Sequence, residues 1–91
     1  MSASSIVIHR VADYDAWHEV YESVAGLQEA GGVRSERVLR GTDDPLMVVV
    51  EHVFDDAAAA HAFFDNEELR SAMGEGGVDM STFQLIITEP A

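Results

Sequence analysis

Cysteine and lysine are both missing from this 91-residue chain. Without cysteine the chain can form neither a disulfide nor a thiolate metal site, and it has no cysteine nucleophile. Its five basic residues are all arginine and stand against 17 acidic residues, which gives a formal net charge of −12. Because binding to nucleic acid or to an anionic membrane depends on clustered positive charge, we expect neither kind of partner.

Long apolar runs are also missing, since no segment approaches the ~20 residues that cross a bilayer. The short, neutral N-terminus lacks the features of a secretion signal, so we expect a cytoplasmic protein. A hydrophobic content of 47% is nevertheless too high for a disordered chain. The length suits one domain. We therefore predict a single domain over residues 1–91, with loose ends at 1–4 and 90–91.

The order of strand and helix patterns predicts the fold. Strands are expected at 5–11, 33–40, 46–54 and 82–88, because these segments are short and rich in β-branched residues. An apolar stripe at helical spacing predicts a helix from residue 14 to residue 27, and a second helix over 57–73 is expected to break and restart at Asn66. This β-α-β-β-α-β order predicts an α+β, ferredoxin-like sandwich, in which we expect the strands 5–11 and 46–54 to be parallel neighbours.

Two helices can cover only one face of such a sheet. The strand segments 6–8, 46–50 and 85–87 are nevertheless apolar at successive positions, so both of their faces need cover. A lone monomer would leave a large apolar patch in water, which monomers rarely do. The sequence therefore predicts a homodimer in which the two sheets face each other.

Three motifs resemble those of a known superfamily. They are VADYDAW over residues 11–17, RGTDDP over 40–45 and FFDNEELRSAM over 63–73. In these motifs the chain resembles the dimeric α/β-barrel superfamily, and within it the small proteins grouped with antibiotic-biosynthesis monooxygenases and often labelled cyclases. The resemblance spans residues 5 to 89 and implies two protomers that form one dimeric α/β barrel.

The resemblance leaves two classes of function open. One is a cofactor-independent monooxygenase or cyclase-like enzyme that acts on a small aromatic or polyketide-like substrate. The other is a non-catalytic dimeric module that binds a small apolar ligand or accompanies other proteins. Because the sequence has no flavin, nicotinamide or haem motif, we expect no cofactor. No metal site is expected either, because His18 and Glu22 are four residues apart on the first predicted helix but a site usually needs three or four ligands.

Two histidines are the candidate catalytic residues. His9 and His52 lie in neighbouring predicted strands, and either one, near a strand end, can act as a general base or bind a ligand inside a pocket between helices and sheet. The alternative is that both are hydrogen-bonded structural histidines.

Aromatic and sulfur side chains are the candidate pocket lining. The predicted helices supply Tyr14, Trp17, Tyr21, Phe63 and Met73 to this layer, and an apolar cavity with a few polar groups suits a small hydrophobic ligand. The alternative is that these side chains interlock as ordinary core and leave no void.

Overall fold

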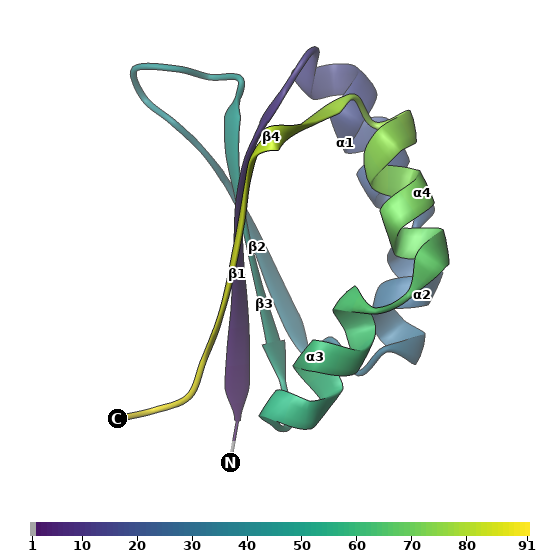
Figure 1. Cartoon of the computed structure of the whole chain (residues 1–91), viewed down its shortest axis with the longest axis vertical. Helices are drawn as coiled ribbons and strands as arrows, with labels where there is room; N and C mark the ends of the chain where they lie inside the picture. Colours follow the sequence, from purple (N-terminus) through teal and green to yellow (C-terminus); the bar gives the residue numbers. More distant parts are fainter. Residues whose placement is uncertain (1) are drawn as a thin grey trace.

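The computed structural model describes residues 2–91 and shows a sheet with helices on one of its faces (Figure 1). Four strands in the order β2-β3-β1-β4 form the sheet. The predicted α+β, ferredoxin-like fold is confirmed. In chain order the elements are β1 (Ala3–Val11), α1 (Tyr14–Ser23), α2 (Ala25–Ala30), β2 (Ser35–Arg40), β3 (Met47–Phe54), α3 (Ala57–Phe64), α4 (Glu67–Glu75) and β4 (Val78–Thr88).

The prediction that the strands of 5–11 and 46–54 run parallel is wrong. β1 and β3 are antiparallel, and His9 pairs with Val48 while His52 pairs with Ser5. The reason is the hairpin between β2 and β3, which reverses the chain, so that β1 is parallel to β2 and not to the strand between them. The side chains of His9 and His52 still share the helix-covered face, because directly paired residues point to the same side of a sheet.

β1 begins earlier than expected. Residues 1–4 were predicted to be a loose end, but the strand starts at Ala3, which pairs with Phe54 and is 2% exposed. A small apolar side chain at this alternate position continues the buried row of β1.

Side-chain caps explain where the helices begin. The Asp13 carboxylate accepts a hydrogen bond from the backbone N–H of Ala16 (3.0 Å) and starts α1. The predicted restart at Asn66 is confirmed, since its side-chain oxygen accepts from the N–H of Glu68 (2.8 Å). Such caps satisfy backbone donors that have no partner within the helix. The first predicted helix differs, because it is divided at Val24 into α1 and α2.

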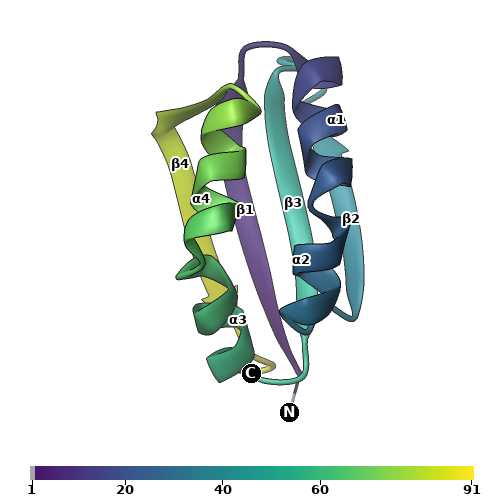
Figure 2. The same cartoon turned by 90° about the vertical axis from the view of Figure 1, so that its right-hand side faces the viewer.

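The helices form two columns on the same face of the sheet. Figure 2 shows α1 and α2 over β2 and β3, with α3 and α4 over β1 and β4. The buried core lies between these columns and the sheet, in two clusters. The first consists of Val7, Val11, Trp17, Val48 and Val50, and the second of Phe54, Ala60, Phe63 and Leu69.

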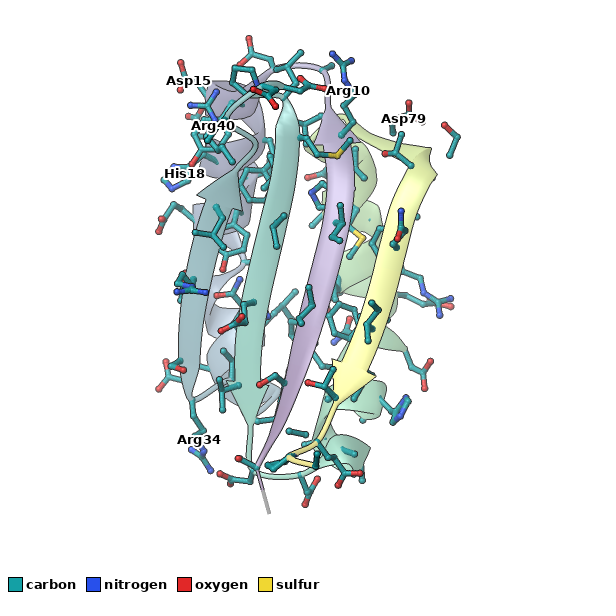
Figure 3. All side chains as sticks on the ribbon, turned by 90° about the vertical axis from the view of Figure 1, so that its left-hand side faces the viewer. Arg10, Asp15, His18, Arg34, Arg40 and Asp79 are labelled. Carbon is teal, nitrogen blue, oxygen red and sulfur yellow. The ribbon has the colours of Figure 1, made fainter. Side chains whose placement is uncertain are left out.

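The opposite face of the sheet has no helix over it (Figure 3). The register assigns to this open face the apolar side chains Ile6, Ile8, Leu39, Met47, Val49, Val53 and Ile86. Leu39 is 41% exposed and Ile86 is 51% exposed. Charged residues are also present, with Arg37 and Glu51 paired across β2 and β3 (3.8 Å), Arg10 and Asp79 at one end, and Arg34 at the other (Figure 3). No helix of the described residues is long and apolar enough to cross a membrane.

We expect the open face to be covered by a second copy of the chain. Sedimentation at micromolar concentration should give about 20 kDa, twice the 9.9 kDa of one chain. Val49→Asp should give monomers that keep their far-UV circular dichroism, because this side chain points away from the helices and a buried, unpaired charge disfavours the dimer. Val49→Thr is the matched control and should remain dimeric. Wild-type protein that sediments as a monomer would contradict the dimer.

Candidate functional site

A cavity of about 50 Å³ lies between the helix columns and the sheet. Its walls are apolar and aromatic apart from a few polar side chains supplied by β1, α1, α2 and β3. The lining residues are Val7, His9, Trp17, Val20, Tyr21, Val24, Gln28, Val50, His52, Phe63, Phe64, Leu69, Ala72 and Met73. Among the described residues 2–91, no aspartate, glutamate or arginine lines the cavity. The cavity therefore favours an uncharged molecule.

The His52 imidazole is held by a hydrogen bond from one side only. Its Nε2 lies 2.9 Å from the Tyr21 hydroxyl oxygen, which in turn lies 3.0 Å from Oε1 of Glu36 on β2. The other ring nitrogen, Nδ1, is buried and has no hydrogen-bond partner among the described residues. Burial lowers the pKa of His52, and the negative charge of Glu36 raises it in part. His52, which lines the cavity, is therefore a neutral imidazole with one unpartnered nitrogen.

His9 is buried among rings, with both of its nitrogens unpartnered within the described chain. Its ring stacks on Phe83 at a centroid distance of 6.2 Å and meets the edge of Trp17 at 5.8 Å. Burial lowers the pKa of His9 from 6.5 to about 4, so the imidazole is neutral at physiological pH. A neutral imidazole has one donor and one acceptor nitrogen, and buried groups of this kind normally have partners.

An irregularity in the sheet accounts for the surroundings of His9. The register between β1 and β4 shifts beside this residue, and such bulges re-aim nearby side chains. The bulge is stabilised by Asp79, whose carboxylate accepts hydrogen bonds from the backbone N–H (3.0 Å) and hydroxyl (2.6 Å) of Ser81. The Thr82 hydroxyl then accepts from the N–H of Arg10 (2.8 Å). These polar contacts replace the interrupted ladder.

A row of rings connects the two histidines along α1. Trp17 stacks on Tyr21 at 5.0 Å, and Tyr21 lies 6.1 Å from His52. Four residues of strand separate the positions of His9 and His52 in the register, which corresponds to about 13 Å at ~3.3 Å per residue. The two imidazoles are therefore at opposite ends of one ring-lined layer and are not in contact.

The structure brings most of the sequence-predicted pocket residues together. Trp17, Tyr21, Phe63 and Met73 line the cavity with both histidines. Tyr14 does not line it, which corrects that prediction. Its ring packs on Trp17 (5.7 Å) and lies under the Arg40 guanidinium carbon (3.8 Å), because the first turn of α1 extends past the cavity to the end of the sheet.

Two residues of the site were missed in the sequence. Gln28 is 4% exposed and lines the cavity, and it continues the helical spacing of Trp17, Tyr21 and Val24, so periodicity could have found it. Glu36 could not have been found, because its contact with Tyr21 joins an edge strand to a helix and no local sequence pattern indicates which residues of two such elements meet. 

His18 and Glu22 form a pair on the surface of α1, with 3.2 Å between Nε2 of His18 and Oε1 of Glu22. No group of three or more candidate ligand side chains occurs within the described residues. Two side chains alone fall short of the usual coordination of a bound transition metal.

Stability should depend on pH through His9. In the unfolded chain this group binds a proton below its pKa of 6.5, whereas in the folded chain it does so only below about 4. The free energy of unfolding should therefore fall as pH falls through this window, by about 3 kcal/mol for His9. Urea unfolding at fixed protein concentration checks this. His9→Phe should flatten the pH dependence, and the exposed control His61→Gln should leave it unchanged. An unaltered slope in His9→Phe would contradict the assignment.

Truncation of Trp17 should be costly. The side chain is 5% exposed and contacts rings on several sides, so Trp17→Ala should lower the free energy of unfolding by ~3–5 kcal/mol. Tyr14→Ala is the comparison, and its cost should be smaller because that residue is only half-buried. Denaturant unfolding of both variants gives the answer. Equal costs would mean that Trp17 borders a much larger void than the cavity described above.

Comparison with known proteins identifies the fold. No protein-family model matches the chain, and no curated protein matches it. Solved structures do match. SnoaB, a cofactor-independent oxygenase from Streptomyces nogalater, superposes with a TM-score of 0.80 at 13% identity over 99% of this chain and 93% of its own. The ActVA-Orf6 monooxygenase of Streptomyces coelicolor, solved with nanaomycin D, gives 0.70 at 21% identity over 99% and 88%.

A third similar structure comes from an archaeon. It is a conserved protein from Methanosarcina mazei, with a TM-score of 0.69 at 10% identity over 100% of this chain and 94% of its own. At such identities a likeness establishes the fold, while function depends on the site. The resemblance predicted from the motifs is confirmed at this level: the chain has the fold of solved antibiotic-biosynthesis-monooxygenase-like proteins.

Proposed function

We propose that this protein is a cofactor-independent monooxygenase whose substrate is an uncharged, hydroxylated polycyclic aromatic molecule. The observation that carries the proposal is a pair of buried, neutral imidazoles with unpartnered nitrogens at opposite ends of a ring-lined cavity. Two polar groups about 13 Å apart along the strands suit a flat molecule with oxygen functions at both ends. The oxygenases SnoaB and ActVA-Orf6 share the fold and add support.

The charge of the site narrows the substrate class. The cavity lining has no cationic side chain to pair with an anion, and the chain carries a net charge of −12. Burial of an unpaired carboxylate there would be costly. A phenol or a ketone, by contrast, needs only one hydrogen bond for each oxygen, which the imidazoles can donate or accept.

The chemistry then follows from His52. Its free Nδ1 accepts the proton of a substrate hydroxyl, and the phenolate formed is rich enough in electrons to react with dioxygen. Where the activated ring carries a methylene group, its carbon is oxidised to a carbonyl. One oxygen atom of O₂ enters that carbonyl and the other leaves as water with the two methylene hydrogens. His9 binds the oxygen function at the far end of the substrate.

The size of the cavity requires that it open. At about 50 Å³ it holds a few water molecules, whereas ligand pockets commonly measure ~300–1,000 Å³. Val24 and Ala72 also border a surface groove of about 480 Å³ between the α1–α2 column and α4. Separation of α1 from α4 at these two residues would join the groove to the cavity, so we propose that the substrate enters there.

The test uses dihydroxyanthrone, which has phenolic hydroxyls and an oxidisable methylene, and its di-O-methyl ether. We expect the protein to accelerate oxygen consumption with the phenol and not with the ether. His52→Phe should lower the rate ~10²–10⁴-fold, the usual contribution of a general base. His61→Gln, an exposed histidine, is the control and should keep the wild-type rate.

The second candidate function is a non-catalytic ligand-binding module, which the same ring-lined cavity with its unpartnered imidazole nitrogens would serve without a reaction. Under that function either anthrone raises the melting temperature, but oxygen consumption stays at the uncatalysed rate. If neither anthrone changes the melting temperature or the rate, the proposed substrate class is wrong.

A further inference from the structure

We infer that Glu36, an exposed residue of the edge strand, acts through Tyr21 to fix the tautomer of His52, so that the cavity presents a hydrogen-bond acceptor and selects ligands that bring a hydroxyl. Glu36 is a positioning residue in this arrangement, because it does not line the cavity itself. The inference about ligands rests on the proposed function, whereas the tautomer belongs to the protein alone.

The direction of the hydrogen bonds follows from counting protons. An ionised carboxylate can only accept, so the contact of 3.0 Å between Glu36 and the Tyr21 hydroxyl requires that the phenol donate. A phenol has one proton. The contact of 2.9 Å between the same oxygen and Nε2 of His52 must then use a proton on the imidazole.

The tautomer of His52 follows at once. A neutral imidazole carries one N–H, and burial keeps His52 neutral by lowering its pKa. With the proton on Nε2, the lone pair is on Nδ1, the buried nitrogen that has no partner among the described residues. The unpartnered nitrogen of His52, a residue that lines the cavity, is therefore an acceptor.

The surroundings of Tyr21 agree with this direction. Burial raises the pKa of Tyr21, as do the hydrogen bond to Glu36 and its negative charge, so the phenol keeps its proton. The Gln28 side chain acts in the opposite sense, as expected of an amide that donates toward the phenol oxygen. Ser5 is the other polar group beside His52, opposite it in the register, and its hydroxyl is also unpartnered.

The consequence for ligands is specific. A molecule that brings a hydroxyl to Nδ1 gains a hydrogen bond and satisfies a buried polar atom. A molecule that brings an ether or carbonyl oxygen places two acceptors together, which leaves both unsatisfied and costs binding free energy. Without the Glu36–Tyr21 contact, Tyr21 could donate to Nε2 instead, and the same cavity would present an N–H donor.

The experiment observes the His52 ring nitrogens by ¹⁵N NMR at neutral pH, on the whole unliganded protein. In the wild type we expect the protonated signal at Nε2 and the unprotonated signal at Nδ1. Glu36→Lys replaces an acceptor with a donor, so Tyr21 should turn its proton toward His52 and the two signals should exchange for most molecules. Glu36→Gln should retain the wild-type pattern, because its amide oxygen still accepts.

The matched control is Glu29→Lys. Glu29 borders the same surface hollow as Glu36, and its substitution by lysine changes the charge by the same amount. The hydrogen bond of the Tyr21 hydroxyl goes to Glu36 and not to Glu29. Glu29→Lys should leave the tautomer unaltered, as should Ser5→Ala. A wild-type protein with the proton on Nδ1, or a Glu36→Lys variant with the wild-type pattern, would overturn the inference. If Glu36→Lys does not fold, Glu36→Ala should still shift the population toward Nδ1–H, and an unchanged population there would refute the role of Glu36.

These outcomes are separable from those of the proposed function. If the tautomer responds to Glu36 but neither anthrone binds, the substrate class fails and the positioning role stands. If the phenol reacts in preference to its ether while the tautomer ignores Glu36, the site is an oxygenase without this control.

Discussion

The alternation of side chains along β1 and β3 is the constraint on which the rest of the site depends. In both strands every second residue faces the helices, and these positions are almost fully buried. His9 and His52 occupy two of them, so each imidazole is removed from water by the same periodicity that builds the core. Burial then keeps both rings neutral, and neutral rings with free nitrogens are what a base or a hydrogen-bonding ligand site requires.

Burial of a polar group without a partner costs stability, and the protein reduces this cost unequally. His52 has one nitrogen satisfied through Tyr21, whereas His9 has neither satisfied by the described residues. The bulge of β4 beside His9 supplies a stacked ring, from Phe83, and no polar partner. Unsatisfied buried atoms are uncommon in folded proteins and call for an explanation. Their position at one cavity makes a ligand or ordered water the natural partner.

The sequence predicted the fold well because periodicity and caps are local. The helix start at residue 14 and the restart at Asn66 are both found where they were expected, and the order of strands and helices was enough to predict the fold. The sequence was a poorer guide to the direction of neighbouring strands and to which residues meet across the fold. The strand containing His52 was expected to be parallel to β1, but the hairpin between β2 and β3 makes it antiparallel. Tyr14 shares the apolar stripe of α1 but lies beyond the cavity, because a stripe indicates a face and not a position along it.

The contact between Glu36 and Tyr21 shows why a site of this kind is only partly visible in a sequence. Glu36 is exposed on an edge strand, where a charged residue is expected for reasons of solubility and protection from aggregation. Its position opposite His52 in the register brings the carboxylate near the hydroxyl that α1 extends toward the sheet. Three unremarkable residues, from an edge strand, a helix and a central strand, thus define the hydrogen-bonding character of a buried nitrogen. Fold likeness cannot supply that character, because proteins of this architecture need share only their backbone, whereas proton placement depends on each acceptor and donor in turn.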